Sequence, residues 1–258
     1  IAQEAGALVR EHFGRVRSVE FKGVVDPVTE ADTETEELIL DRLRTAFPDH
    51  RILAEESGGE EWRASGSPIW LVDPIDGTNN FAHDFPHVGI SLALVQEREP
   101  LVGVIYDPLR DELFAAAAGE GATMDGESIG VTEVPSLADA FLATGFPYDR
   151  RTAADNHVER LDHFLRRSQG VRRAGAATLD LAYVACGRFD GFWEIRLNPW
   201  DVAAGVLLVR EAGGRATDFG GGRDCLSGDA IVASNGQIHD EMLRVIREGA
   251  DAPRPEGS

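Results

Sequence analysis

One short stretch after the apolar run 69–72 holds the residues of this sequence most suited to chemistry. The run predicts a buried strand, and Asp73 stands directly at its end. Asp76 follows closely, and Gly77 and Thr78 are expected to open a short helix with Asp76 near its N-terminus. Carboxylates bind hard cations, and the free N–H groups of a helix N-terminus bind phosphate. The stretch therefore favours metal-assisted phosphoryl transfer, although such Asp-Pro and Asp-Gly pairs also occur in solvated turns.

Four carboxylates share a placement at the end of an expected strand or the beginning of an expected helix: Glu55, Asp73, Asp76 and Asp201. Gathered in one place, so many acids would repel one another unless cations neutralised them. The sequence has no His or Cys constellation typical of zinc. We therefore expect Mg²⁺ rather than a transition metal.

Asp32 lies in the first turn of an expected helix over 31–46. With Thr29 it forms the pattern of a capping box, in which each side chain bonds the other residue's backbone N–H. A carboxylate at this position also complements the helix dipole. The residues alone leave a structural and a chemical role open.

Three motifs occur in order along the chain: Ala54-Glu55-Glu56-Ser57, the stretch from Trp70 to Phe81, and the stretch from Pro199 to Gly205. On these motifs the sequence resembles the inositol monophosphatase family of Mg²⁺-dependent, Li⁺-sensitive phosphatases. The resemblance covers most of the chain. It implies an enzyme that hydrolyses phosphomonoesters, most simply inositol 1-phosphate to inositol and phosphate.

The resemblance also implies the metal ligands. Glu55, Asp73 and the carbonyl of Ile75 would hold a first Mg²⁺, and Asp73, Asp76 and Asp201 a second. A third, weaker metal position would involve Glu55, so each active site would hold two to three Mg²⁺ ions.

The implied catalytic residues are Asp32, Thr78 and Glu56. Thr78, hydrogen-bonded to Asp32, and Glu56 as a helper would orient a metal-activated water and accept its proton. This water attacks phosphorus in line, so no phospho-enzyme is expected.

Substrate contacts are implied for eight residues: Asp76, Gly77, Thr78, Gly175, Ala176, Ala177, Glu194 and Asp201. Backbone N–H groups of Gly77 and Thr78 would hold the phosphate, and Glu194 would accept a hydrogen bond from a polyol, unless it serves only as a strand-end salt bridge. Ala176 stands where many relatives have Ser or Thr, which removes a hydroxyl but leaves the backbone contacts.

Several alternatives stay open at this point. Relatives with the same metal core hydrolyse histidinol phosphate, fructose 1,6-bisphosphate or 3′-phosphoadenosine 5′-phosphate. The ending Thr78-Asn79-Asn80-Phe81 resembles the inositol phosphatase branch rather than the nucleotide branch. Some bacterial relatives instead act in RNA-polymerase antitermination complexes, largely without catalysis.

Composition sets further expectations for the 258 residues. A net charge of −20 argues against direct nucleic-acid binding, because phosphate would be repelled. No apolar run is long enough to cross a membrane, and two cysteines in unrelated contexts, Cys186 and Cys225, suit a reducing compartment. We expect a cytoplasmic protein, and the resemblance implies a homodimer. Because Ile1 lies inside an expected helix, the natural N-terminus is expected to be trimmed.

The pattern of elements predicts two lobes. Residues 1–137 read as antiparallel strands flanked by two helices, with a meander over 88–96, 101–107 and 112–118. Residues 138–250 alternate strands and helices, including a long helix over 153–169, and 251–258 read as a disordered tail. This agrees with the layered αβαβα sandwich that the resemblance implies, with an antiparallel sheet in the N-terminal half and a smaller mixed sheet in the C-terminal half. Four arginines form a cluster that is expected on a solvated face or at a subunit contact, with contact to a substrate phosphate as the alternative: Arg166, Arg167, Arg172 and Arg173.

Overall fold

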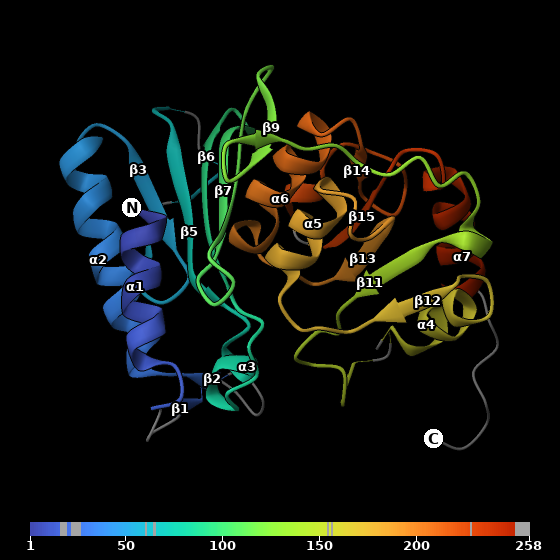
Figure 1. Cartoon of the computed structure of the whole chain (residues 1–258), viewed down its shortest axis with the longest axis horizontal. Coiled ribbons are helices and arrows are strands. Elements are labelled where there is room, and N and C mark those ends of the chain that lie inside the picture. Colours follow the sequence, from blue (N-terminus) through green and yellow to red (C-terminus); the bar gives the residue numbers. More distant parts are fainter. Residues whose placement is uncertain are drawn as a thin grey trace.

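The computed structural model of the chain describes residues 1–15, 20–21, 27–59, 61–63, 66–153, 155, 157–227 and 229–250. Five layers follow one another across the molecule: a helix pair, a large sheet, a second helix pair, a smaller sheet and a third helix pair (Figure 1). The predicted αβαβα sandwich is confirmed. The expected tail 251–258 lies outside the described residues.

The large sheet has eight strands in the order β10-β9-β8-β7-β6-β5-β3-β4. Its strands are β3 (Arg51–Ala54), β4 (Gly58–Gly59), β5 (Ile69–Asp76), β6 (Gly89–Gln96), β7 (Glu99–Asp107), β8 (Glu112–Ala117), β9 (Gly121–Met124) and β10 (Glu127–Ser128). The predicted meander is present as β6 to β8. The sheet is not wholly antiparallel, because β3 and β5 run parallel. Two further strands, β1 (Glu20–Phe21) and β2 (Pro27–Val28), pair with each other.

The smaller sheet has the order β12-β11-β13-β15-β14 and is mixed, as expected. Its strands are β11 (Phe141–Thr144), β12 (Gly170–Arg172), β13 (Gly191–Ile195), β14 (Arg215–Thr217) and β15 (Ala230–Ser234). β11 runs parallel to β12 and β13, whereas β15 runs antiparallel to β13 and β14.

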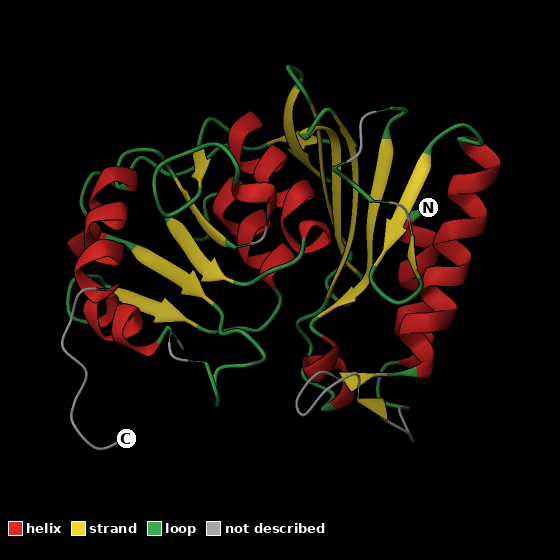
Figure 2. Ribbon diagram, turned by 180° about the vertical axis from the view of Figure 1, so that it is seen from behind, coloured by secondary structure: helices red, strands yellow, loops and turns green. Residues whose placement is uncertain are grey.

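The helices fill the layers around these sheets (Figure 2). They are α1 (Ala2–His12), α2 (Glu30–Ala46), α3 (Thr78–Ala82), α4 (Val158–Leu165), α5 (Ala177–Ala185), α6 (Pro199–Glu211) and α7 (His239–Ala250), with short 3₁₀ turns at Leu137–Asp139 and Cys225–Ser227. Helix α6 is buried on every side over residues 202–209, because it lies between the two sheets. Among the described residues, no helix is both long and apolar enough to span a membrane.

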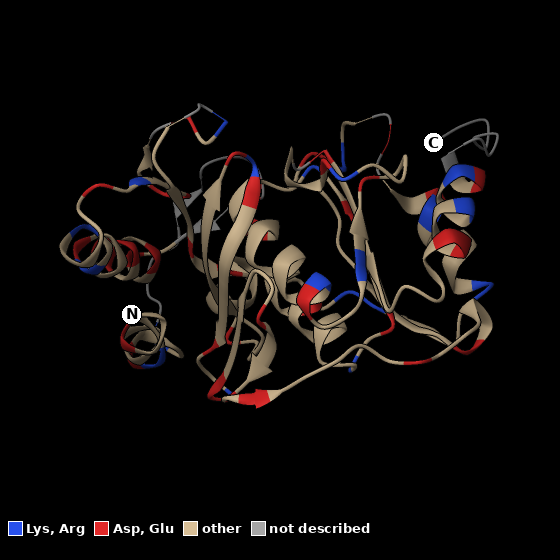
Figure 3. Ribbon diagram, turned by 90° about the horizontal axis from the view of Figure 1, so that it is seen from above, with Lys and Arg blue, Asp and Glu red and all other residues tan. Residues whose placement is uncertain are grey.

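Three apolar cores hold the layers together. One lies between the two sheets around α5 and α6, one joins α1 and α2 to the large sheet, and one joins α4 and α7 to the smaller sheet. Charged residues lie mostly on the outer helices and at loop ends, whereas the central helices are largely uncharged (Figure 3). The proposed lobe boundary at 137/138 falls in the 3₁₀ turn Leu137–Asp139 and stays a prediction.

Two local predictions need correction. The strand expected to stop at residue 72 continues as β5 to Asp76, with a register shift between Asp73 and Asp76 against β6. The helix expected over 153–169 is confined to Val158–Leu165, because His157 before it adopts φ 74° and cannot continue a right-handed helix. The N–H of His157 bonds the Asp155 carboxylate instead, which is typical of a turn.

Candidate active site

A single pocket of about 580 Å³ gathers most of the predicted residues. It lies where the C-terminal end of β5 and helix α3 meet the segments before α4, α5 and α6. Eleven of the predicted site residues line it: Glu55, Asp73, Ile75, Asp76, Gly77, Thr78, Gly175, Ala176, Ala177, Glu194 and Asp201. Asp32 and Glu56 are not among its lining residues.

Three carboxylates form one wall of this pocket, called here the acidic wall: Glu55, Asp73 and Asp201. One oxygen from each lies within 4.8 Å of the others. Glu55 follows β3, Asp73 lies in β5, and Asp201 is the third residue of α6, where it closes a capping box with Asn198. Three elements distant in sequence thus deliver one acidic group each.

The acidic wall carries unbalanced negative charge. Burial, followed by the charges of Glu55, Asp76 and Asp201, raises the pKa of Asp73 well above its ordinary value. Burial and the charges of Glu55 and Asp76 do the same to the pKa of Asp201. Oδ1 of Asp73 is buried and accepts no hydrogen bond from a described residue. Clustered carboxylates with an unpartnered buried oxygen fit a hard divalent cation.

Asp76 is held differently from the acidic wall. Its Oδ2 accepts hydrogen bonds from the N–H of Thr178 at 2.7 Å and from the Thr178 hydroxyl at 2.6 Å. Burial raises the pKa of Asp76 to about 6, and the Thr178 bonds lower it from a still higher value. Asp76 therefore lies beside the acidic wall with one oxygen bound to α5.

Thr78 and Asp32 meet as the resemblance implied. The Thr78 hydroxyl lies 3.1 Å from Oδ1 of Asp32 and 3.0 Å from the carbonyl oxygen of Ile75. The predicted capping box is present, since Oδ2 of Asp32 accepts from the N–H of Thr29 at 2.8 Å and from its hydroxyl at 2.5 Å. Burial raises the pKa of Asp32, and its hydrogen bonds with Thr29 and Thr78 oppose that shift. Asp32 thus supports Thr78 from behind the pocket.

A second group of residues that line the pocket, called here the mixed wall, carries both signs of charge: Arg173, Gly175, Asp180 and Glu194. Burial raises the pKa of Glu194 to about 8, and the positive charge of Arg173 opposes this shift. Arg173 acts in the same direction on the pKa of Asp180, which burial and the charge of Glu194 raise. A Cβ at position 145 would overlap the Glu194 carboxylate, so Gly145 makes room for it.

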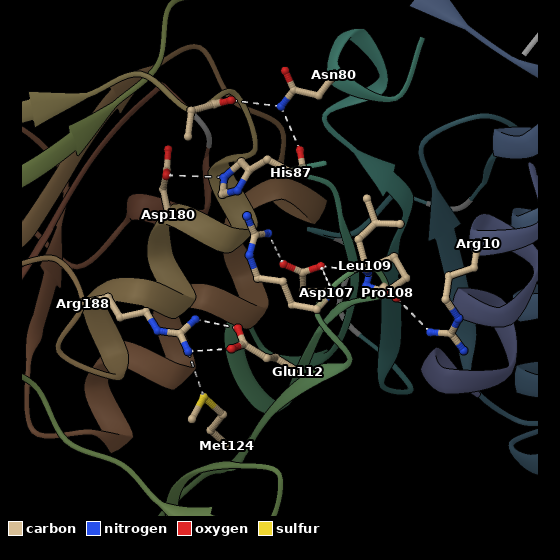
Figure 4. A network of polar contacts seen from close by, with 12 residues as sticks. Arg10, Asn80, His87, Asp107, Pro108, Leu109, Glu112, Met124, Asp180 and Arg188 are labelled. Carbon is tan, nitrogen blue, oxygen red and sulfur yellow. Dashed lines mark hydrogen bonds and ion pairs between the residues drawn. The ribbon is translucent and has the colours of Figure 1, made fainter. Parts of the chain in front are cut away.

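Gly77 lets the motif that carries Asp73 and Thr78 approach the chain around Gly175. Gly77 adopts φ 92°, and a Cβ there would lie 3.1 Å from the carbonyl oxygens of Gly175 and His87. Nδ2 of Asn80, in α3, donates to the carbonyl oxygens of His87 at 2.8 Å and Ala174 at 2.9 Å (Figure 4). The motif that carries Asp73 and Thr78 is thereby fastened to the chain that carries Gly175.

Sequence reasoning missed several pocket residues. Asp180 is 1% exposed and lies in the otherwise apolar helix α5, which is a signal that could have singled it out. Its Oδ1 lies 4.0 Å from Nε2 of His87, the partner drawn in Figure 4. Of the arginine cluster, only Arg173 reaches the pocket, whereas Arg166 and Arg167 pair with Asp162 and Glu248 on the surface. The pocket is also lined by three arginines that no local sequence pattern predicted: Arg150, Arg151 and Arg196.

Comparison with known proteins shows the family to which the chain belongs. The model of the "Inositol monophosphatase family" matches residues 1–250. The chain belongs to the inositol monophosphatase family. It is 44% identical to the inositol-1-monophosphatase of Synechocystis over 94% of this chain and 84% of that protein. It is 42% identical to the Nus factor SuhB of Pseudomonas aeruginosa over 95% of this chain and 93% of that protein.

The solved structures agree with this assignment. The inositol monophosphatase from Anabaena superposes with a TM-score of 0.87 at 43% identity, covering 96% of this chain and 92% of the other. The chain is therefore a phosphatase of this family, and its substrate carries a phosphate group.

Proposed function

We propose that this phosphatase hydrolyses inositol 1-phosphate to inositol and phosphate with Mg²⁺ held by the acidic wall. The observation that carries the proposal is the approach of three carboxylates to within 4.8 Å of one another in a pocket that also holds Glu194. The name of the Synechocystis relative supports the same substrate.

The proposed ligands divide into two sets. Glu55, Asp73 and the Ile75 carbonyl would hold one Mg²⁺, and Asp73, Asp76 and Asp201 a second, with a weaker third ion at Glu55. When bound, Mg²⁺ supplies positive charge that offsets the charge on the phosphate group and the departing alkoxide.

Thr78 and Asp32 are proposed to handle the proton of the attacking water. The Thr78 hydroxyl donates its proton towards Asp32 or the Ile75 carbonyl, so its lone pairs are left to accept a hydrogen bond from water. A proton passed through Oγ1 of Thr78 would reach Oδ1 of Asp32, a carboxylate whose pKa burial raises. Glu56 is proposed to help Thr78 and Asp32 orient the attacking water and accept its proton.

Phosphate and polyol contacts complete the proposal. Backbone N–H groups of Gly77 and Thr78 would bind phosphate oxygens. Glu194, with a pKa of about 8, carries its proton at neutral pH and can both donate to and accept from neighbouring hydroxyls of a polyol. The remaining hydroxyl contacts are assigned to Asp76, Asp201 and the backbone of Gly175, Ala176 and Ala177.

A substrate with a second anionic group is the alternative that a specific observation favours. Four arginines line the same pocket: Arg150, Arg151, Arg173 and Arg196. Arg173 is one of them, and a guanidinium group offers paired N–H donors that match the oxygens of a phosphate. Fructose 1,6-bisphosphate and 3′-phosphoadenosine 5′-phosphate each carry such a group, whereas histidinol phosphate does not.

The test is phosphate release with Mg²⁺, with and without Li⁺, from four substrates: inositol 1-phosphate, histidinol phosphate, fructose 1,6-bisphosphate and 3′-phosphoadenosine 5′-phosphate. We expect preference for the inositol ester and inhibition by Li⁺. An Arg151→Gln variant serves as the control, because it should lower turnover only of a substrate with two phosphates. Preference for another ester would overturn the substrate while keeping the chemistry. Absence of release from all four would favour the non-catalytic binding role.

The homodimer and the cytoplasmic location stay predictions. A small phosphorylated polyol is the proposed partner, and direct nucleic-acid binding is not expected for a chain with a net charge of −20.

A further inference from the structure

Glu36 of α2 is a buried carboxylate that faces the turn over residues 55–57. Its side chain is only 3% exposed. Oε2 accepts a hydrogen bond from the N–H of Glu56 at 2.8 Å, and Oε1 accepts one from the N–H of Ser57 at 2.8 Å. Both oxygens of one carboxylate are therefore used on two successive backbone donors.

The flanking strands hold the two ends of the turn. The N–H of Glu55 bonds the carbonyl oxygen of Val72 at 3.1 Å, which ties the first residue of the turn to β5. The turn leads into β4, which consists only of Gly58 and Gly59. Glu36 thus satisfies two of the three successive N–H groups of this turn, and these groups would lose their acceptors without it.

The position of Glu36 on α2 links the turn to the rest of the site. Asp32 and Glu36 are four residues apart in the same helix, so both side chains lie on one face. Asp32 bonds Thr78, whereas Glu36 bonds the turn that carries Glu55. One rigid helix face therefore fixes the Thr78 hydroxyl and the Glu55 turn relative to each other.

We propose that Glu36 is a positioning residue that sets the Glu55 carboxylate for metal binding by clamping the backbone of residues 56 and 57. This inference deepens the proposed Mg²⁺-dependent function and rests on it. A carboxylate is needed because it offers an acceptor to each N–H. The side chain of Gln would offer one oxygen and turn its amide group, a donor, towards the other N–H.

The test measures metal binding directly in the full chain. Mn²⁺, which shares the preference of Mg²⁺ for oxygen ligands, is titrated into wild type, Glu36→Gln and Glu37→Gln, and free Mn²⁺ is followed by electron paramagnetic resonance. Glu37 is exposed on the same helix, so its variant matches the change of charge without touching the turn. We expect about 10- to 100-fold weaker Mn²⁺ binding in Glu36→Gln, the range typical of residues that orient a metal ligand. Glu37→Gln should bind as wild type does.

Steady-state kinetics separate positioning from a general structural defect. In Glu36→Gln the Mg²⁺ concentration for half-maximal rate should rise by about the same factor, while KM for substrate at saturating Mg²⁺ stays close to wild type. A folded Glu36→Gln variant that binds Mn²⁺ as tightly as Glu37→Gln would overturn the inference and leave the proposed function standing. Failure of the wild type to bind Mn²⁺ would overturn both.

A measurement on the wild type alone covers the case in which Glu36→Gln does not fold. The clamp predicts that the amide hydrogens of residues 56 and 57 exchange slowly in the metal-free protein, because both are bonded to Glu36. Exchange of both amides at the rate of an open loop would refute the clamp.

Discussion

The acidic wall and the mixed wall face the same pocket with opposite ways of balancing charge. On the acidic wall, the charged neighbours that most raise the pKa of Asp73 are other carboxylates: Glu55, Asp76 and Asp201. On the mixed wall, the positive charge of Arg173 opposes the raised pKa of both Glu194 and Asp180. A cation from outside the chain would therefore balance the charge of the acidic wall, whereas on the mixed wall Arg173 offsets part of the charge.

The backbone supports the two walls differently as well. Asp201 is fixed by a capping box, with its Oδ2 accepting from the N–H of Asn198 at 2.6 Å. Glu194 instead lies inside strand β13, where Gly145 leaves space beside it. We infer that the acidic wall holds its carboxylates in fixed positions for a metal ion, whereas the mixed wall provides a space that matches the shape of the substrate. Changes on the acidic wall should affect kcat and metal binding, and changes on the mixed wall should affect KM and substrate choice.

Asp201→Asn should have the largest effect. Asn keeps an oxygen that can accept a hydrogen bond from the N–H of Asn198, so the cap and the fold should remain. The negative charge that the Asp201 carboxylate would offer to the metal ion is lost. We expect turnover to fall by about 10³-fold, equivalent to about 4 kcal/mol. Phosphate release and circular dichroism measure the two parts of this prediction. Near-normal turnover in this variant would show that Asp201 is not a metal ligand.

Thr78→Ala should have the next largest effect. It removes the hydroxyl that lies 3.1 Å from Asp32 but leaves every carboxylate of the acidic wall in place. We expect kcat to fall by about 10²-fold with little change in Mn²⁺ binding, as for loss of a proton-transfer group. Thr78→Ser is the matched control, because it retains the hydroxyl and should recover most of the rate. An equal loss in both variants would point to packing of the Thr78 methyl group instead.

The sequence predicted the acidic wall better than the mixed wall, for a physical reason. The acidic residues stand at the ends of strands or in helix caps, and these positions have local signals such as the pairing of Asn198 with Asp201. Asp180 lies in α5 and Arg173 directly follows β12, and their approach to Glu194 of β13 depends on the packing of these elements, which no local spacing encodes. The layered fold was predictable because strand and helix patterns alternate in order along the chain.

Errors in the predicted elements have equally local causes. Periodicity continued through residues 153–157, but the left-handed backbone of His157 and its bond to Asp155 delay the helix to Val158. Strand β5 continues past Asp73 because the pairing with β6 resumes at Asp76 after a register shift. Both features depend on backbone geometry that hydrophobic spacing does not contain.

Glu194→Ala should have a smaller effect, confined to substrate binding. Ala removes both the donor and the acceptor that the carboxyl of Glu194 offers to a polyol, whereas Gln would keep one of each, as the protonated carboxyl does. We expect KM for inositol 1-phosphate to rise about tenfold, close to the value of one hydrogen bond, with kcat changed by less. Initial rates over a range of substrate concentrations measure this split. A loss in kcat alone would place Glu194 with the acidic wall and weaken the distinction between the walls.

The smallest effect concerns the stability of the metal-free protein between pH 6.5 and 8. A carboxyl whose pKa is raised in the folded state contributes stability at low pH that is lost as the pH rises through that raised pKa. This applies to Glu194, with a pKa of about 8, and to Asp73 and Asp201, whose pKa values are raised by burial and mutual repulsion.

Buried histidines act with the opposite sign but in a different window. Burial lowers the pKa of His157 and His239 to about 4, so their contribution is present above pH 6.5 and is lost as the pH falls towards 4.

Between pH 6.5 and 8 the carboxyls therefore dominate, and the melting temperature of the metal-free protein should fall by a few degrees, about 2–4 °C for each kcal/mol lost. Mg²⁺ should offset the fall and raise the melting temperature more at pH 8 than at pH 6.5, because it binds the ionised acidic wall. In Glu194→Gln part of the fall should disappear while the Mg²⁺ effect persists. Calorimetry of wild type and Glu194→Gln at the two pH values, with and without Mg²⁺, separates the contributions of the two walls. If Mg²⁺ did not change the fall in melting temperature, the fall would come from the mixed wall alone.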